Sequence, residues 1–249
     1  MRTLLAVIAC IQLFLVASIG FVFVALVFLP TFWFDKKRLL CGRTLRYVAV
    51  AAIKTSPVWR FRIHGEVPRK GPGRAVCVSN HCSHVDVFLI SHVPWEMKWL
   101  AKRSLFNIPF IGWGMWLAMD VPIRRASPAA AKAALDECAR WLERDVPVMI
   151  FPEGTRSKTG ELQPFKDGAF RLAIDTGADV LPMAVAGTGA ALVKDDWRPR
   201  RARGALVIGK PISTQGMTVA DVPRLKEAAR AQILALREQA LPFAGSLTH

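Results

Sequence analysis

The chain begins with one long apolar stretch before any periodic pattern appears. No charged side chain lies between Arg2 and Asp35, and this stretch is longer than the roughly 20 residues that a helix needs to cross a bilayer core of about 30 Å. A signal peptide has a shorter apolar region and ends in a small-residue cleavage site, which this segment lacks. We therefore predict a membrane helix that either crosses the bilayer or enters it from one side.

A second helix is predicted directly after this segment. Apolar residues recur there on one face of a helical wheel, at Cys41, Leu45, Val48 and Ala52. This pattern is typical of an interfacial helix that lies along lipid headgroups. The basic residues that follow Asp35 place the rest of the chain in the cytoplasm under the positive-inside rule. We expect membrane-anchoring helices over 1–55 and a folded domain over 56–249, on the cytoplasmic side of the inner (cytoplasmic) membrane of a cell.

From about residue 56 onward, short apolar runs alternate with helical patterns. Trp59, Phe61 and Ile63 alternate with polar neighbours, which predicts a strand with one wet face. Further strands are expected at 75–79, 98–101, 120–123, 146–151, 180–187 and 204–209. Helices are expected at 83–92, at 105–118 with an interruption, and at 128–144, 168–176 and 218–239. This alternation predicts an α/β fold, a mostly parallel sheet flanked by helices, with its functional residues beyond the carboxyl ends of the strands.

The composition narrows the class of partner. Hydrophobic residues make up 52% of the 249 residues, and 34 Lys and Arg against 19 Asp and Glu give a formal net charge of +15. A basic, apolar chain suits an anionic membrane or a nucleic acid, but no nucleic-acid motif accompanies the basic run at 197–203. We therefore expect an anionic membrane as partner and no nucleic acid. The run itself is either a membrane-surface patch or a solvated loop.

A histidine and an aspartate five residues apart follow the predicted strand 75–79. Residues five apart do not share a helix face, so His81 must lie in the loop and Asp86 in the first helical turn for them to meet. An imidazole oriented by a carboxylate is a general base near neutral pH. Three alternatives stay open: a capping-box pair with Ser83, a metal site and a serine hydrolase. The spacing fits no zinc pattern well and the chain has no GxSxG motif, so we expect no metal.

Cations and hydrogen-bonding groups follow three further strands. The strand 146–151 is followed by Glu153, Gly154, Thr155 and Arg156. A cation, a hydroxyl and an exposed backbone N–H suit a phosphate, although a solvated turn with a Glu–Arg pair is the alternative. Lys102 follows another strand, and Arg124 and Arg125 follow the next. The four strand ends together indicate one base, several phosphate-binding cations and no covalent nucleophile.

These blocks, taken in order, resemble the glycerolipid acyltransferases, and most closely the bacterial 1-acyl-sn-glycerol-3-phosphate (lysophosphatidate) acyltransferases. The segment from Asn80 to Asp86 matches the NHxxxxD block of that family. Further blocks match at 101–113 with Ile123 and Arg125 beyond it, at 151–157 with 164–170, and at 181–185. The chain departs from the family pattern at Arg124, where aspartate is common, and at Met119 or Asp120, where glycine is usual.

The resemblance implies an acyltransferase catalytic domain over 56–249 and a role for each residue. His81, oriented by Asp86, would deprotonate the sn-2 hydroxyl of lysophosphatidate, and the alkoxide would attack the thioester of an acyl-CoA or acyl-carrier protein. Lys102 or an N–H near Gly154 would stabilise the oxyanion. The acceptor phosphate would be held by Arg125, Glu153, Thr155 and Arg156. No cofactor is expected besides the acyl donor.

Two alternatives to phosphatidate synthesis stay open. The acceptor could be another lysolipid such as lyso-ornithine lipid, or glycerol 3-phosphate. Alternatively, the chain could be a non-catalytic, membrane-anchored lipid-binding protein. The sequence leaves the choice of donor and the oligomeric state undetermined.

Overall fold

The computed structural model describes residues 2–124, 127–157, 159–193 and 195–246. Its centre is an eight-stranded sheet in the order β1-β7-β6-β2-β5-β3-β4, with β8 paired to β7. The strands are β1 (Trp59–His64), β2 (Ala75–Ser79), β3 (Lys98–Lys102), β4 (Val121–Ile123), β5 (Val148–Ile150), β6 (Asp179–Ala186), β7 (Ala202–Ile208) and β8 (Gly245–Ser246).

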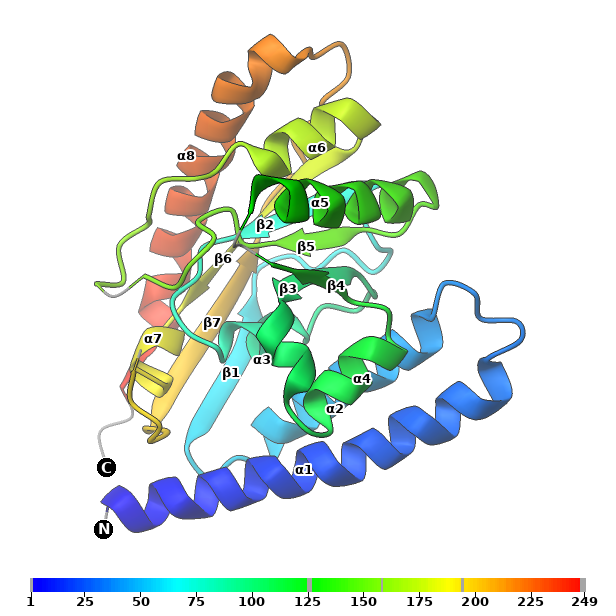
Figure 1. Cartoon of the computed structure of the whole chain (residues 1–249). Coiled ribbons are helices and arrows are strands. Elements are labelled where there is room, and N and C mark those ends of the chain that lie inside the picture. Colours follow the sequence, from blue (N-terminus) through cyan, green and yellow to red (C-terminus); the bar gives the residue numbers. More distant parts are fainter. Residues whose placement is uncertain (1, 125–126, 158, 194, 247–249) are drawn as a thin grey trace.

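Helices cover both faces of this sheet (Figure 1). The α-helices are α1 (Arg2–Thr31), α2 (Leu39–Lys54), α3 (Asp86–Ile90), α4 (Ile111–Leu117), α5 (Pro128–Glu143), α6 (Gly168–Thr176), α7 (Thr188–Ala191) and α8 (Val222–Ala240). The 3-10 helices are η1 (Arg103–Asn107), η2 (Val219–Asp221) and η3 (Leu241–Phe243). The predicted α/β fold with a mostly parallel sheet flanked by helices is confirmed.

The sheet separates two hydrophobic cores, because successive residues of a strand point to opposite faces. Val76 and Val78 of β2 join a core that includes buried residues of α5, α6 and α8. Cys77, between them, joins the second core, which includes buried residues of α2 and α3 and Ala9 of α1. The continuous burial of β2 follows from this double cover.

Strand direction decides which residues meet at one edge. β2 pairs in parallel with both β5 and β6, and β3 pairs in parallel with both β5 and β4. β7 is antiparallel to β6 and parallel to β1. We use the term carboxyl rim for the edge at which β2, β5, β3, β4 and β6 end. The first residues of β1 and β7 lie at that same edge.

The long apolar helix α1 packs along the domain rather than standing apart from it. It runs along the base in Figure 1, against α2 and α4. Phe14 stacks edge-on against Phe110 with a 5.7 Å centroid separation, and Phe21 packs likewise on Trp113 at 5.5 Å. Among the described residues, the one helix long and apolar enough to cross a membrane is Thr3–Thr31, and 11% of its most apolar window is buried. An apolar surface of this length therefore faces outward along the base.

The second predicted helix is also present, and it lies between α1 and the sheet. α2 contacts α1 on one side and α3, α4 and β1 on the other. Cys41 and Ala52 of its predicted apolar face are buried. Gly20 of α1 lets the two helices approach closely, because a Cβ there would overlap the side chain of Val48. Its position relative to lipid headgroups stays a prediction.

Several predicted boundaries were wrong. The predicted helix 83–92 is shortened to α3, because the side chain of Asp86 accepts the amides of Cys82 and Ser83 and holds them as a loop. The predicted segment 105–118 divides into η1 and α4, with Phe110 at a φ of 63° between them. β7 begins two residues before the predicted strand 204–209. The predicted final helix begins later, at Val222, after a 3-10 turn capped by Thr218.

Candidate active site

His81 and Asp86 form a close pair at the carboxyl rim. Nδ1 of His81 lies 2.7 Å from Oδ2 of Asp86, which also accepts the backbone N–H groups of Cys82 at 2.8 Å and Ser83 at 2.9 Å. A carboxylate surrounded by donors takes the Nδ1 proton of the ring as a third one, so the neutral ring keeps Nε2 as an acceptor. The side chain of Asp86 is fully buried, whereas that of His81 is 13% exposed. The pair can therefore accept a proton at Nε2 of a partly exposed ring.

The backbone on either side of this histidine is fixed by neighbouring strands. The side chain of Asn80 donates to the carbonyl of Val185 and accepts the amide of Val185, each at 2.9 Å. The amide of His81 donates to Oε1 of Glu153 at 2.6 Å, and its carbonyl accepts the amide of Ser157 at 2.8 Å. The loops after β2 and β5 are thus joined around His81, because these two strands are direct neighbours.

Glu153 holds backbone groups in this structure. Its Oε2 accepts the amide of Gln163 at 3.0 Å, so both carboxylate oxygens are engaged with backbone N–H groups. Burial raises the pKa of Glu153, although the amides of His81 and Gln163 favour its charged form. In this arrangement both oxygens hold backbone amides, whereas the resemblance implies that Glu153 contacts the acceptor phosphate.

The turn after β5 places an aromatic ring against the imidazole ring of His81. Phe151 stacks on His81 with 4.0 Å between centroids and 14° between planes. The next turn needs Gly154, which has a φ of 70° and whose Cβ would crowd the side chain of Lys166. The amide of Gly154 donates to the carbonyl of Phe151 at 3.0 Å. The N–H of Gly154 itself is therefore occupied within the turn.

The predicted cations lie in a row along the carboxyl rim. The sheet order β2-β5-β3-β4 places the loop of His81, the 153–156 segment, Lys102 and Arg124 after successive strands. Neighbouring strands are about 4.8 Å apart, so the ends of β2 and β4 are roughly 14 Å apart. Lys102 and Arg124 are exposed, as is Thr155. Arg125, the expected phosphate contact in this row, lies outside the described residues.

The charges of this row act on a second histidine. Partial desolvation is the main cause that lowers the pKa of His84 to about 4, with further lowering by Arg156, His81 and Lys102 against the opposing charge of Asp86. His84 is therefore neutral at neutral pH.

The other side chains in the loop are unsuited to covalent catalysis. Burial, followed by the negative charges of Asp86 and Glu153, raises the pKa of the Cys82 thiol to about 12, so it does not supply a thiolate. The hydroxyl of Ser83 donates to the carbonyl of Leu192 at 2.8 Å. The amide of Ser83 donates to Asp86, which is one half of the capping-box pair that stood as an alternative. Among the described residues, no group of three or more His, Cys, Asp or Glu side chains is placed to hold a metal ion.

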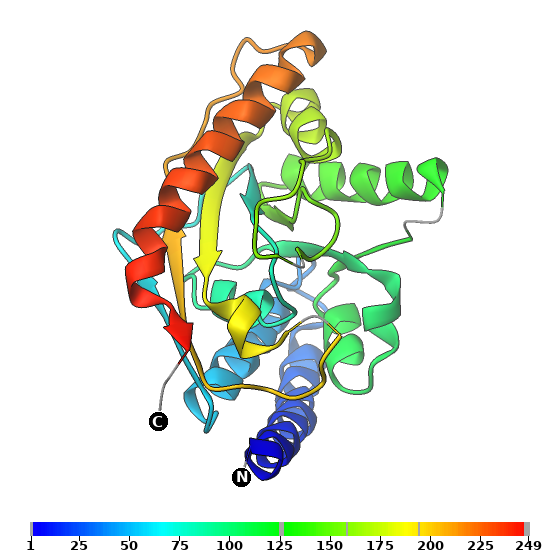
Figure 2. The same ribbon diagram turned by 90° about the vertical axis from the view of Figure 1, so that its left-hand side faces the viewer.

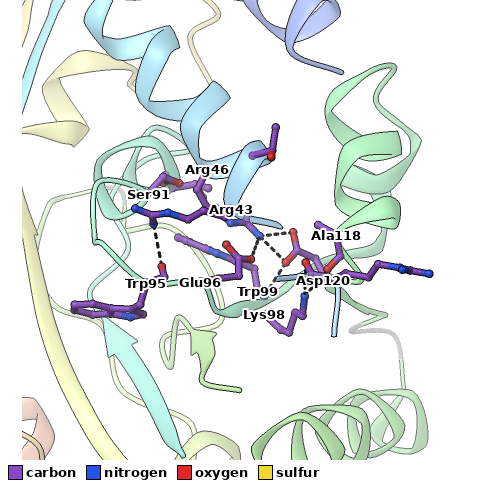
Figure 3. A network of polar contacts seen from close by, with 12 residues as sticks. Arg43, Arg46, Ser91, Trp95, Glu96, Lys98, Trp99, Ala118 and Asp120 are labelled. Carbon is purple, nitrogen blue, oxygen red and sulfur yellow. Dashed lines mark hydrogen bonds and ion pairs between the residues drawn. The ribbon is translucent and has the colours of Figure 1, made fainter. Parts of the chain in front are cut away.

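A buried ionic network, which the sequence motifs do not indicate, supports the strand that carries Lys102. Figure 3 shows Arg46 of α2 reaching Asp120 at the start of β4, with separations of 2.7 and 2.8 Å to its two oxygens. Asp120 also accepts the amide of Trp99, and Lys98 donates to the carbonyl of Ala118 at 2.6 Å. This network ties α2 to β3 and β4. A single arginine in an otherwise apolar helical face was the available signal.

Glu96 belongs to this network, but its carboxylate lacks hydrogen-bond partners among the described residues. Its carboxylate lies 3.6 Å from Arg46, and both of its oxygens are buried without a hydrogen-bond partner among the described residues. Burial raises the pKa of Glu96 to about 7, against the opposing charges of Arg46 and Lys98. Gly42 of α2 is required above it, because a Cβ there would overlap the Glu96 carboxylate.

Three comparisons with known proteins relate this geometry to a family. The family model described as Acyltransferase matches residues 60–186. A 1-acyl-sn-glycerol-3-phosphate acyltransferase of Arabidopsis thaliana chloroplasts is 39% identical over 140 residues, which are 56% of this chain and 39% of that protein. The human 1-acyl-sn-glycerol-3-phosphate acyltransferase alpha is 33% identical over 161 residues, which are 64% of this chain and 57% of that protein.

The fold has a solved counterpart. The crystal structure of the 1-acyl-sn-glycerophosphate (LPA) acyltransferase PlsC from Thermotoga maritima superposes with a TM-score of 0.73 at 22% identity, covering 95% of this chain and 98% of that one. The chain spans 39% of the length of the Arabidopsis relative that it matches. The matched residues include the pair of His81 and Asp86, which we call the dyad, and the loop after β5. They also include strand β6, whose Val185 is hydrogen-bonded to the side chain of Asn80. The chain therefore belongs to the Acyltransferase family.

Proposed function

We propose that the protein is a 1-acyl-sn-glycerol-3-phosphate O-acyltransferase that forms phosphatidate. The observation that carries this proposal is the 2.7 Å pair of His81 and Asp86 at the same sheet edge as Arg156 and Lys102. Family membership and the activity for which the Arabidopsis and human relatives are named point to the same acceptor. A phosphate-bearing acceptor suits a rim where Lys102, Arg124 and Arg156 lie at the ends of neighbouring strands.

The reaction uses His81 as a base and then as an acid. Nε2 takes the proton of the sn-2 hydroxyl as the oxygen attacks the thioester carbonyl, and Asp86 stabilises the imidazolium that forms. The tetrahedral intermediate collapses with loss of the thiolate, which receives the proton from Nε2. The new ester bond replaces the thioester, so no cofactor is consumed. Lys102 supplies positive charge for the oxyanion.

The acceptor phosphate is assigned to Arg156 and Thr155, with Arg125 as a further contact. Glu153 is assigned a positioning role instead, because both of its oxygens already bind backbone amides. Gly154 contributes the tight turn that brings this segment to the rim. We assign the anchoring role to residues 1–55 and catalysis to 56–249, with α1 in the cytoplasmic membrane and the catalytic domain on its cytoplasmic side, following the basic residues after Asp35.

An acyl-transfer assay on the purified full chain tests the proposal. Lysophosphatidate, lyso-ornithine lipid and glycerol 3-phosphate are each offered with a long-chain acyl-CoA and with the same acyl group on acyl-carrier protein. We expect product with lysophosphatidate and at least one of the donors. Product only with lyso-ornithine lipid or glycerol 3-phosphate would replace the proposed acceptor, and no product with any pair would support a binding protein instead.

A further inference from the structure

A cationic groove of about 550 Å³ lies on β1 and β7, apart from the dyad. Its charged and aromatic lining consists of Arg60, Arg62, His64, Arg201, Arg203 and Phe243. We call the four arginines of this set the arginine groove. The ring of His64 stacks on Phe243 of η3 with 3.9 Å between centroids, and this pair forms one wall.

The register of β1 and β7 brings like charges together. Arg60 is paired with Arg203 across the two parallel strands, and like charges in facing positions are destabilising. Trp59 and Phe61 point into the core shared with α3, so Arg60 and Arg62 project from the opposite face, which carries α8. Because like charges repel, the proximity of these arginines does not stabilise the fold.

Among the described residues, no acidic side chain lines this groove. The guanidinium of Arg60 donates to the carbonyls of Ser56 and Trp59. Arg62, Arg201 and Arg203 form no ion pair with any residue in the described part of the chain. Each guanidinium retains a planar fork of donors that matches phosphate. The groove is therefore complementary to a phosphate group that the protein itself does not supply.

The basic run at 197–203 divides into two kinds of arginine. Arg198 and Arg200 both bind Asp196, at 2.9 Å each, and these pairs lower the pKa of Asp196. Arg201 and Arg203, within the same run, line the groove instead. In the sequence the four arginines form one basic run. In the structure Arg198 and Arg200 are neutralised by Asp196, whereas Arg201 and Arg203 can bind a ligand in the groove.

The groove adjoins the helix that carries the apolar surface. Sγ of Cys10 in α1 lies 4.0 Å from the carbonyl of Trp197, four residues before Arg201. Gln12 of α1 binds Thr55 at 2.7 Å, two residues before Pro57, which also lines the groove. Figure 2 shows the loop that leads into β7 passing above the N-terminal end of α1. Both segments that build the groove therefore start beside α1.

We propose that the arginine groove binds the phosphate of an anionic phospholipid headgroup in the bilayer that holds α1. The proposal rests on the proposed membrane location of α1, and it concerns a lipid that is bound but not acylated. His81 stacks on Phe151, which packs on the core of the opposite sheet face. The groove is thus separate from the site assigned to the acceptor. Bound lipid would hold this end of the domain against the membrane surface.

Lipid binding to the full chain in neutral detergent tests the proposal. Dioctanoyl phosphatidylglycerol is the probe, since it carries one phosphate diester and is not an acyl acceptor of the proposed reaction, and dioctanoyl phosphatidylcholine is the zwitterionic reference. Affinity is measured for the wild type, for Arg201→Gln/Arg203→Gln, and for Arg198→Gln/Arg200→Gln. The two double variants remove the same formal charge from the same run, but only the first removes side chains that line the groove.

We expect the Arg201→Gln/Arg203→Gln variant to bind phosphatidylglycerol about 30-fold more weakly, and the Arg198→Gln/Arg200→Gln variant to bind it within about threefold of the wild type. Equal weakening in both variants, or none in either, would overturn the proposal. Retained lipid affinity with a raised KM for acyl-CoA would assign the groove to donor phosphates instead. If millimolar inorganic phosphate displaces bound phosphatidylglycerol as effectively as unlabelled lipid does, the groove is a general anion site and the lipid proposal is overturned. Acyl transfer in neutral micelles should persist in both variants, which separates this test from that of the proposed function.

Discussion

Oδ2 of Asp86 lies 2.7 Å from Nδ1 of His81 and accepts two backbone amides of the same loop as well. One oxygen therefore fixes the loop conformation, the ring orientation and the tautomer together. The partner oxygen, Oδ1, is buried without a hydrogen-bond partner among the described residues. The carboxylate interacts with His81 and its loop, so substitutions at Asp86 should lower kcat more than they change the affinity for substrate.

Replacing Asp86 by Asn should lower kcat by about 100- to 10,000-fold. All three contacts are made by one oxygen of Asp86, so an asparagine places either its oxygen or its NH₂ group at that position. An amide oxygen there keeps the contacts but carries no charge to stabilise the imidazolium, whereas an NH₂ group there faces two N–H donors and favours the tautomer with the proton on Nε2, which cannot act as the base. Steady-state kinetics on the purified variant provide the measurement, and an unchanged circular dichroism spectrum controls for folding. A kcat within threefold of the wild type would remove Asp86 from the mechanism.

Replacing Glu153 by Gln should reduce kcat by about tenfold or more and leave the acceptor KM nearly unchanged. One of its two oxygens becomes an NH₂ group that faces a backbone N–H, so the His81 loop loses a support. Glu161→Gln is the matched control, because that exposed glutamate lies in the following loop. If the acceptor KM rises instead while kcat is kept, Glu153 contacts the substrate directly, as the family resemblance implies.

Replacing Arg156 by Ala should weaken use of the phosphate group. Loss of a charge-assisted contact should lower kcat/KM for lysophosphatidate by about 10- to 100-fold, mainly through KM. The value for 1-monoacylglycerol, which lacks the phosphate, should change little. Arg171→Ala is the control, since Arg171 is an exposed cation paired with Asp175 on α6. Equal losses for both acceptors would contradict a phosphate role.

Replacing Glu96 by Gln should stabilise the protein at high pH. Burial raises the pKa of Glu96 to about 7 in the folded state, from 4.5. Between these values the folded state holds the proton that the unfolded state has lost, so wild-type stability falls as pH rises from about 4.5 to about 7. The difference is on the order of 3 kcal/mol above pH 7.

Glutamine resembles the neutral acid and removes this pH dependence. The other charged groups that act on Glu96, namely Arg46, Lys98, Asp120 and Arg43, stay the same in the variant. Thermal unfolding in detergent at pH 5 and pH 8 measures the effect. The gain of Glu96→Gln over the wild type should be larger at pH 8, and a gain that is equal or smaller there would show that Glu96 is charged in the folded protein.

The fold class and the dyad could be predicted because they depend on local signals. Strand and helix periods alternate in the sequence, and His81 and Asp86 lie five residues apart at the junction of a buried strand and a helix. The parallel pairing of β2 with β5 then follows from the fold class, and it joins the two motifs. The order and spacing of the sequence blocks along the chain were sufficient to indicate the resemblance to the family.

The remaining features depend on contacts between distant segments. Arg46 meets Asp120 across 74 positions, and Asn80 meets Val185 across 105, so no local pattern reveals either contact. The side chain of Glu153 faces backward to the His81 amide, which its position beside Arg156 did not indicate. The division of the basic run at 197–203 likewise depends on Asp196 and on β1, whose arginines come from more than a hundred residues earlier.

The central claim is that His81 is the base of an acyl transfer to lysophosphatidate. The most direct measurement is product formation from lysophosphatidate and acyl-CoA by purified wild type, by His81→Ala, and by His84→Ala as the matched neighbouring histidine. We predict that His81→Ala loses at least about 100-fold in kcat while its unfolding temperature and lysophosphatidate binding are kept, and that His84→Ala stays active. Turnover of His81→Ala near the wild-type rate would contradict the claim.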